Sequence, residues 1–148
     1  MRGVLSLTTV ALLSLGTGLR GQDKPATDLD KLQGTWVPTS AVFGGAEARP
    51  ELLKDRLWVI TGDQLAELNK GRRESRATLT VDGAKKPAAI DVAYIDGMAK
   101  GVMLRGIYKI EGDMLTVCTD TLPGERPTEF VSKSGSGTAL MVFKRAKP

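Results

Sequence analysis

Histidine is missing from this chain of 148 residues, and cysteine occurs once, as Cys118. Without histidine there can be no Ser-His-Asp triad, no Cys-His pair and no imidazole metal site. A single cysteine cannot supply a disulfide framework or a zinc cluster. Aromatic residues make up only 5% of the chain, so few rings are available to stack on nucleic-acid bases. We therefore expect a protein that is not an enzyme, with no catalytic residues, no metal, no cofactor and no nucleic-acid partner.

The residues that are present have the composition of a folded protein. Hydrophobic residues account for 41% and charged residues for 26% of the chain, as in an ordinary globular domain. The length fits one domain, and no shift in composition divides the chain.

The first 21 residues have the pattern of a secretory signal peptide. "MRGVLSLTTVALLSLGTGLRG" begins with the basic residue Arg2, continues with an apolar stretch from Val4 to Leu15 and ends in small residues. This order predicts cleavage after Gly18 or Gly21 and export to the periplasm, the cell envelope or the exterior. The alternative is an uncleaved membrane anchor, although the apolar stretch is short for a span. We expect no membrane span after cleavage.

The remainder divides into a linker and one domain. Residues 22–31, "QDKPATDLDK", are polar and contain a proline, so they predict a linker before a domain over residues 32–146. In "RPELLKD", Pro50 suits the first position of a helix, which predicts one short helix after the first strand. Nothing else in the mature chain has a helical pattern.

Alternating apolar residues separated by turn residues predict an all-β fold. Turn signals such as Asn69-Lys70-Gly71 and Gly112-Asp113 recur at a spacing typical of barrels and sandwiches. Eight or nine segments between them have strand character, including residues 32–43, 102–110, 114–119, 128–132 and 138–145. Consecutive hairpins with one apolar face must hide that face and their edges, which closure into a ring achieves. We predict an up-and-down antiparallel barrel of about eight strands.

The hairpin "GIYKIEGDMLTVCTD", residues 106–120, gives the clearest register. A two-residue turn at Gly112-Asp113, with glycine first, suits a type II′ turn and places Tyr108 opposite Val117 and Ile107 opposite Cys118. Side chains alternate between the two faces of a strand. The predicted interior face carries Leu104, Gly106, Tyr108, Ile110, Leu115, Val117 and Thr119. The predicted solvated face carries Arg105, Ile107, Lys109, Glu111, Met114, Thr116 and Cys118.

Several motifs resemble one family. "LQGTW" places Gly34 and Trp36 at the start of the first strand, similar to the G-x-W signature of lipocalin-like barrels. With "KKPAAIDV", "GIYKIEGDMLTVC", "GERPTEF" and "SGSGTALMVFKR", it resembles the small exported lipocalin-like domains of unknown function that abound in planctomycete-type bacteria. The resemblance covers about residues 30–146. It implies a lipocalin-like β-barrel in which Trp36 closes one end, covered by a basic residue, Arg145 or its neighbour Lys144. The T-D-Y motif of true lipocalins is missing.

The predicted interior is the candidate binding site. It could hold a small apolar molecule, or it could be a packed core with no cavity. The candidate lining residues are Trp36, Ile90, Val92, Tyr94, Leu104, Tyr108 and Val117. Gly34, Trp36 and Arg145 are the candidate structural residues. Two functions follow: an exported, monomeric binding protein, or a module of the cell envelope with a filled barrel whose outer surface binds an envelope protein.

Other candidates have simpler explanations. Cys118 is either a reactive thiol or a small apolar residue partly covered by its neighbours. The basic run "KGRRESR", residues 70–76, could attract an anionic polymer but lacks aromatic residues, so a solvated hairpin is the simpler account. The acidic candidates for acid–base chemistry are Asp91, Asp113, Glu125 and Glu129. Asp91 is predicted to face outward, Asp113 belongs to a turn, and Glu125 and Glu129 flank Arg126, which predicts a local ion pair.

Overall fold

The computed structural model describes residues 27–121 and 124–147 and contains a closed antiparallel barrel. The strands are β1 (Gly34–Phe43), β2 (Ala46–Glu47), β3 (Arg56–Thr61), β4 (Gln64–Asn69), β5 (Arg72–Asp82), β6 (Ala89–Tyr94), β7 (Met103–Glu111), β8 (Met114–Asp120) and β9 (Thr138–Arg145). From β3 to β9 each strand pairs with the next, and β1 pairs with both β3 and β9. β2 pairs with the end of β1, outside the ring of eight. The predicted up-and-down barrel of eight strands is therefore confirmed.

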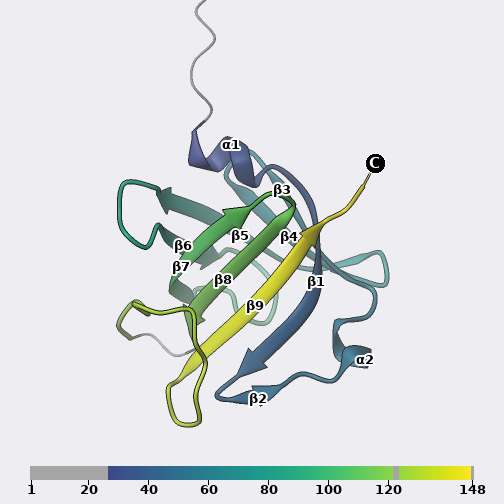
Figure 1. Ribbon diagram of the computed structural model, residues 1–148. Coiled ribbons are helices and arrows are strands. Elements are labelled where there is room, and N and C mark those ends of the chain that lie inside the picture. Colours follow the sequence, from purple (N-terminus) through teal and green to yellow (C-terminus); the bar gives the residue numbers. More distant parts are fainter. Residues whose placement is uncertain (1–26, 122–123, 148) are drawn as a thin grey trace, which may run out of the picture.

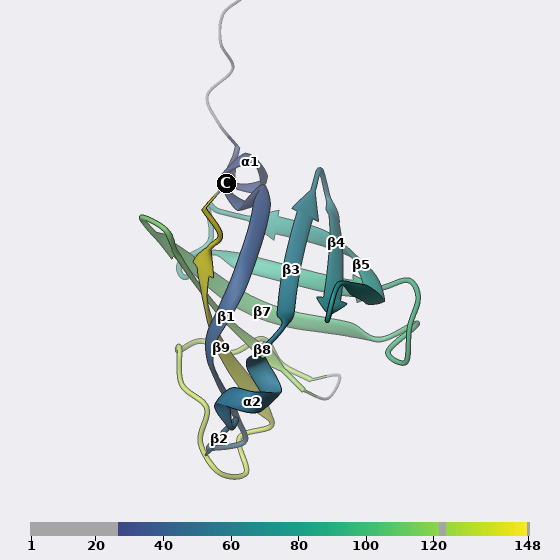
Figure 2. The same ribbon diagram turned by 90° about the vertical axis from the view of Figure 1, so that its right-hand side faces the viewer.

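Two short helices mark opposite ends of the barrel (Figures 1 and 2). α1 (Asp28–Leu32) lies at the end where the chain leaves β9, and α2 (Pro50–Leu53) lies with β2 at the other end. α2 is the helix predicted after the first strand, and proline does occupy its first turn.

α1 corrects the predicted linker. Residues 22–26, like the predicted signal peptide, lie outside the described residues, but Asp28–Lys31, inside the predicted linker, belong to a helix where none was expected. The Thr27 hydroxyl accepts a hydrogen bond from the Asp30 amide, and the Asp30 carboxylate accepts from the Thr27 amide at 2.7 Å. This capping box begins the helix, and Leu32, which is fully buried, holds it against the barrel. One turn is too short to show a helical period in the sequence.

The hairpin of β7 and β8 has the predicted register. Tyr108 is paired with Val117 and Ile107 with Cys118, and Gly112 has a φ of 59°, the left-handed value that a type II′ turn requires first. Alternation then places Tyr108, Leu115 and Val117 in the core.

The opposite face of this hairpin is solvated at Arg105, Lys109 and Glu111, as predicted, but its pair Ile107 and Cys118 is buried, which corrects the prediction at these two residues. Cys118 is 0% and Ile107 1% exposed. Residues 128–132, predicted as a strand, are irregular, and the Cys118 thiol lies 3.6 Å from the carbonyl oxygen of Val131. The connection from β8 to β9 thus covers this part of the face, and Cys118 is the small apolar residue of the second interpretation.

Arg126 attaches the same connection to the barrel. Its guanidinium donates hydrogen bonds to the carbonyl oxygens of Ile90 and Gly106 and forms an ion pair with Asp91 at 2.8 Å. The predicted local pair with Glu125 or Glu129 is therefore wrong, because Asp91, on the outer side of β6, is the partner.

Trp36 closes the α1 end of the barrel. It is fully buried, and its indole Nε1 donates a hydrogen bond to the carbonyl oxygen of Leu32 at 2.8 Å. The Arg145 guanidinium carbon lies 4.1 Å from the Trp36 ring centroid, and the guanidinium also donates to the carbonyl oxygens of Gln33 and Lys31. A side chain at Gly34 would lie 3.2 Å from Arg145, so glycine leaves room for this arrangement. Of the two predicted cations, Arg145 covers the ring.

Candidate ligand cavity

The interior is packed at one end and open at the other. Around Trp36, large side chains such as Leu65, Leu115 and Phe143 meet with 0% exposure. Toward the end where α2 lies, a cavity of about 900 Å³ takes the place of a packed core. The inward side chains of the wall include Trp58, Glu67, Ser75, Val92, Tyr94, Leu104, Val117, Thr119, Ala139, Met141 and Phe143. The connection from β6 to β7 contributes Met98, Ala99 and Val102 at the rim.

Small side chains at inward positions explain why this half is not filled. Ser75, Thr119 and Ala139 face the interior here, where the closed half has Leu and Phe. In addition, β1 pairs with β3 only over Gly34–Trp36. Between Pro38 and Ser40 the β1–β9 register shifts, as at a β-bulge, and β1 continues to its hairpin with β2.

Four of the seven predicted lining residues come together in this wall: Val92, Tyr94, Leu104 and Val117. Trp36 and Ile90 belong to the packed half and do not line the cavity. Tyr108 is also a core residue, and it borders a different cleft near α1. Alternation predicted which side chains point inward, but it could not show at which height of the barrel the packing stops.

Glu67 is the site residue that the sequence analysis missed. It lies on β4 facing inward, where its two carboxylate oxygens accept hydrogen bonds from the Tyr94 hydroxyl at 2.8 Å and the Ser75 hydroxyl at 2.7 Å. Burial, and then the adjacent Glu67 charge, raise the pKa of Tyr94, so this phenol stays protonated and donates. Glu67 lies on the same face of β4 as the buried Leu65, so strand alternation could have placed it inward. It was missed because a carboxylate does not fit the apolar pattern expected of an interior face.

Ion pairs and hydrogen bonds hold the rim. Asp96, before the rim residues, accepts hydrogen bonds from the backbone amide and the guanidinium of Arg76, and Arg73 lies 3.7 Å from the same carboxylate. Arg56 pairs with Glu74 at 3.4 Å. Part of the basic run 70–76 is therefore used to fix the rim, in agreement with the hairpin interpretation.

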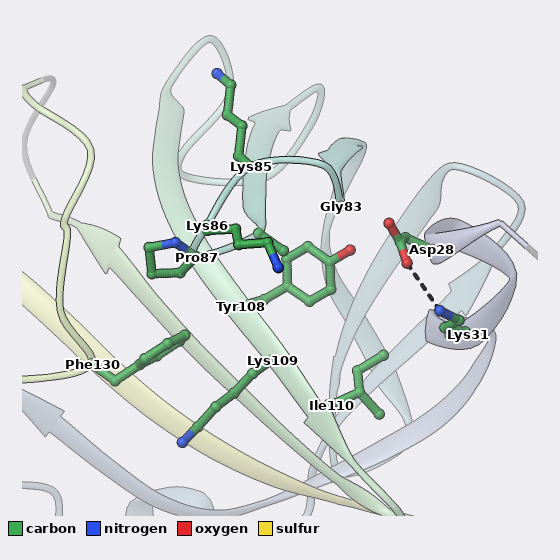
Figure 3. A pocket seen from close by; sticks show the side chains of 11 residues that line it. Asp28, Lys31, Gly83, Lys85, Lys86, Pro87, Tyr108, Lys109, Ile110 and Phe130 are labelled. Carbon is green, nitrogen blue, oxygen red and sulfur yellow. Dashed lines mark hydrogen bonds and ion pairs between the residues drawn. The ribbon is translucent and has the colours of Figure 1, made fainter.

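A second, smaller cleft of about 400 Å³ lies beside α1 (Figure 3). Lysines surround it, but their charges do not converge. Lys85 and Lys109 extend away from the Tyr108 ring, while Lys31 forms an ion pair with Asp28 at 3.2 Å. Lys109 also pairs with Glu111 and lies over the Phe130 ring. The barrel cavity is therefore a better candidate for a ligand site than the cleft beside α1.

In residues 27–121 and 124–147, no group of three or more Cys, Asp or Glu side chains is placed to hold a metal ion. None of the helices in that part of the chain is long and apolar enough to cross a membrane. Comparisons of the chain with protein-family models, with curated proteins and with solved structures found no match.

Proposed function

We propose that this protein is an exported, non-catalytic binding protein that holds a small, mostly apolar molecule in the open half of its barrel. The observation that carries the proposal is the cavity of about 900 Å³, walled by side chains from eight strands. Small-molecule sites in proteins have volumes of roughly 300 to 1,000 Å³, are mostly apolar and contain a few polar groups. Export is supported by the pattern of residues 1–21, and lipocalin-like membership by Gly34, Trp36 and Arg145 at the closed end.

The alternative, a filled barrel acting through its outer surface, agrees less well with the inward side chains. A scaffold gains stability when its interior is filled, because protein interiors pack densely and each void destabilises the fold. Here Ser75, Thr119 and Ala139 leave the space open, while the opposite half is packed with Leu and Phe side chains. The difference between the two halves favours a ligand.

Titration with a neutral fluorescent probe, N-phenylnaphthylamine, tests the proposal. Leu104→Trp places a large side chain in the cavity and should weaken probe binding at least about tenfold, since it displaces the probe. Met103→Trp is the matched control, because Met103 is the neighbouring residue on the outer face and is 46% exposed.

Two results would contradict the proposal. A stable protein that binds no apolar probe, yet retains envelope partners through its outer face, would favour the interaction module. Equal loss of binding in Leu104→Trp and Met103→Trp would place the probe outside the cavity.

Export has its own test. N-terminal sequencing of the protein from its host should give a sequence that begins near Leu19 or Gln22, whereas an intact Met1 on cytoplasmic protein would refute export.

A further inference from the structure

The aromatic residues of this chain are concentrated around the cavity. The sequence contains three Phe, two Tyr and two Trp. Four of these line the cavity: Phe43, Trp58, Tyr94 and Phe143. The ring centroids of Trp58 and Phe143 are 4.3 Å apart with their planes tilted by 35°. Apolar contact alone would be served equally well by aliphatic side chains, so this bias toward rings indicates a ligand group that aromatic faces bind well.

A carboxylate lies in the same part of the wall. Glu67 is the direct cross-strand neighbour of Trp58, and it accepts the hydrogen bond from the Tyr94 hydroxyl. Each of its oxygens accepts one hydrogen bond and can accept another. No lysine or arginine of the described residues forms an ion pair with it. A carboxylate in a largely apolar site is costly without a cation, and two hydroxyl donors compensate only in part.

We infer that the ligand is an amphiphilic organic cation, with an ammonium group between Glu67 and the rings of Trp58 and Tyr94 and an apolar body in the rest of the cavity. An ammonium ion is attracted both to a carboxylate and to aromatic faces, and it can donate to the free acceptor positions of Glu67. The inference rests on the proposed binding function and specifies its ligand. The net charge of the chain, +4 at pH 7, would not by itself predict a cationic ligand. The site is locally acidic within a basic chain.

A displacement assay separates the inference from the binding function on which it rests. The bound neutral probe is displaced by three compounds with the same decyl chain: decylammonium, decanol and decanoate. We expect decylammonium to displace it at a concentration about tenfold lower than decanol, as one charge-assisted contact implies, and decanoate to be the weakest. If neither the probe nor any decyl compound binds, the proposed function fails. If the probe binds but decylammonium is no better than decanol, only the inference fails.

Substitutions then locate the preference. Glu67→Gln keeps the shape of the side chain and removes its charge, so the preference for decylammonium over decanol, measured within the same variant, should disappear. Glu111→Gln, the matched control, makes the same charge change on an exposed hairpin end outside the cavity and should keep the preference. An unchanged preference in Glu67→Gln, or its loss in Glu111→Gln, would overturn the assignment.

Two further variants keep the test decisive if Glu67→Gln does not fold. Trp58→Leu retains an apolar wall but removes a ring, and it should reduce the preference about threefold through the lost cation–ring attraction. Tyr94→Phe removes a donor from Glu67 and keeps both the ring and the carboxylate, so the preference should persist. Loss of the preference in Tyr94→Phe together with its persistence in Trp58→Leu would refute the role of the carboxylate and rings.

Discussion

Arg145→Met should destabilise the barrel, because Arg145 joins α1, Trp36 and β9 at the closed end. The substitution keeps most of the apolar stem and removes the guanidinium. The cation–ring contact with Trp36, at 4.1 Å, contributes about 0.5 to 2 kcal/mol. The hydrogen bond to the half-buried carbonyl oxygen of Gln33 contributes roughly 1.5 to 2 kcal/mol, whereas water can replace the bond to the exposed carbonyl oxygen of Lys31. We expect a loss of about 2 to 4 kcal/mol in the free energy of unfolding.

Urea unfolding followed by tryptophan fluorescence measures this loss. The midpoint should fall without a change in the dependence on urea, since the surface exposed on unfolding stays the same. Lys144→Met is the matched control, because Lys144 is the exposed neighbour on β9, and it should stay within about 0.5 kcal/mol of the parent. A double-mutant cycle with Trp36→Leu should give a coupling of about 0.5 to 2 kcal/mol. If Arg145→Met matches the parent, or Lys144→Met costs as much, the described closure of this end is wrong.

Three further predictions concern single side chains. Burial raises the pKa of the Cys118 thiol, so Ellman's reagent should react quickly only in urea; fast reaction of the native protein would show that the connection does not cover it. The buried Tyr108 hydroxyl has no hydrogen-bond partner among the described residues, so Tyr108→Phe should leave thermal stability equal or slightly higher. Tyr108→Ala should lower the free energy of unfolding by about 3 to 5 kcal/mol, because it removes a buried ring. Its exposed neighbour gives the control: Lys109→Ala should lower it by less than about 0.5 kcal/mol. Hydrogen bonds from Arg76 lower the pKa of Asp96, so this carboxylate stabilises the rim above its ordinary pKa of 3.8 and the effect is lost as the pH falls through the lower folded value. Hydrogen-exchange protection factors in residues 95–102, which correct for the intrinsic pH dependence of amide exchange, should therefore fall in acid for the parent, and protection that does not change with pH would contradict the role of Asp96.

The local pattern of the sequence was enough to predict the barrel and the register of its clearest hairpin. Strand alternation places Tyr108 and Val117 on one face whatever the rest of the chain does, because successive side chains point to opposite sides. A glycine at 112 and the apolar alternation around it specify one turn and therefore one pairing. The resemblance to lipocalin-like barrels implied a basic residue over Trp36 and left Arg145 and Lys144 as alternatives, of which Arg145 lies over the ring.

Features that depend on distant segments were not predictable in this way. Cys118 is on the predicted outer face, but an irregular connection covers it, and irregular segments have no period to indicate what they cover. A capping box alone does not stabilise a helix of five residues; α1 forms because Leu32 is buried in the core of the barrel.

The sequence by itself thus determined which side chains enter the barrel, because the alternation of a strand is a local property of the backbone. Only the tertiary structure decided which of them fill it and which surround a cavity. That outcome depends on the summed volumes of side chains from eight strands that meet at one level, and no stretch of sequence contains this sum. Glu67 shows the difference most clearly. Its strand placed it inward, but the neighbours Trp58, Tyr94 and Ser75, brought there by three other strands, made it part of a candidate binding site.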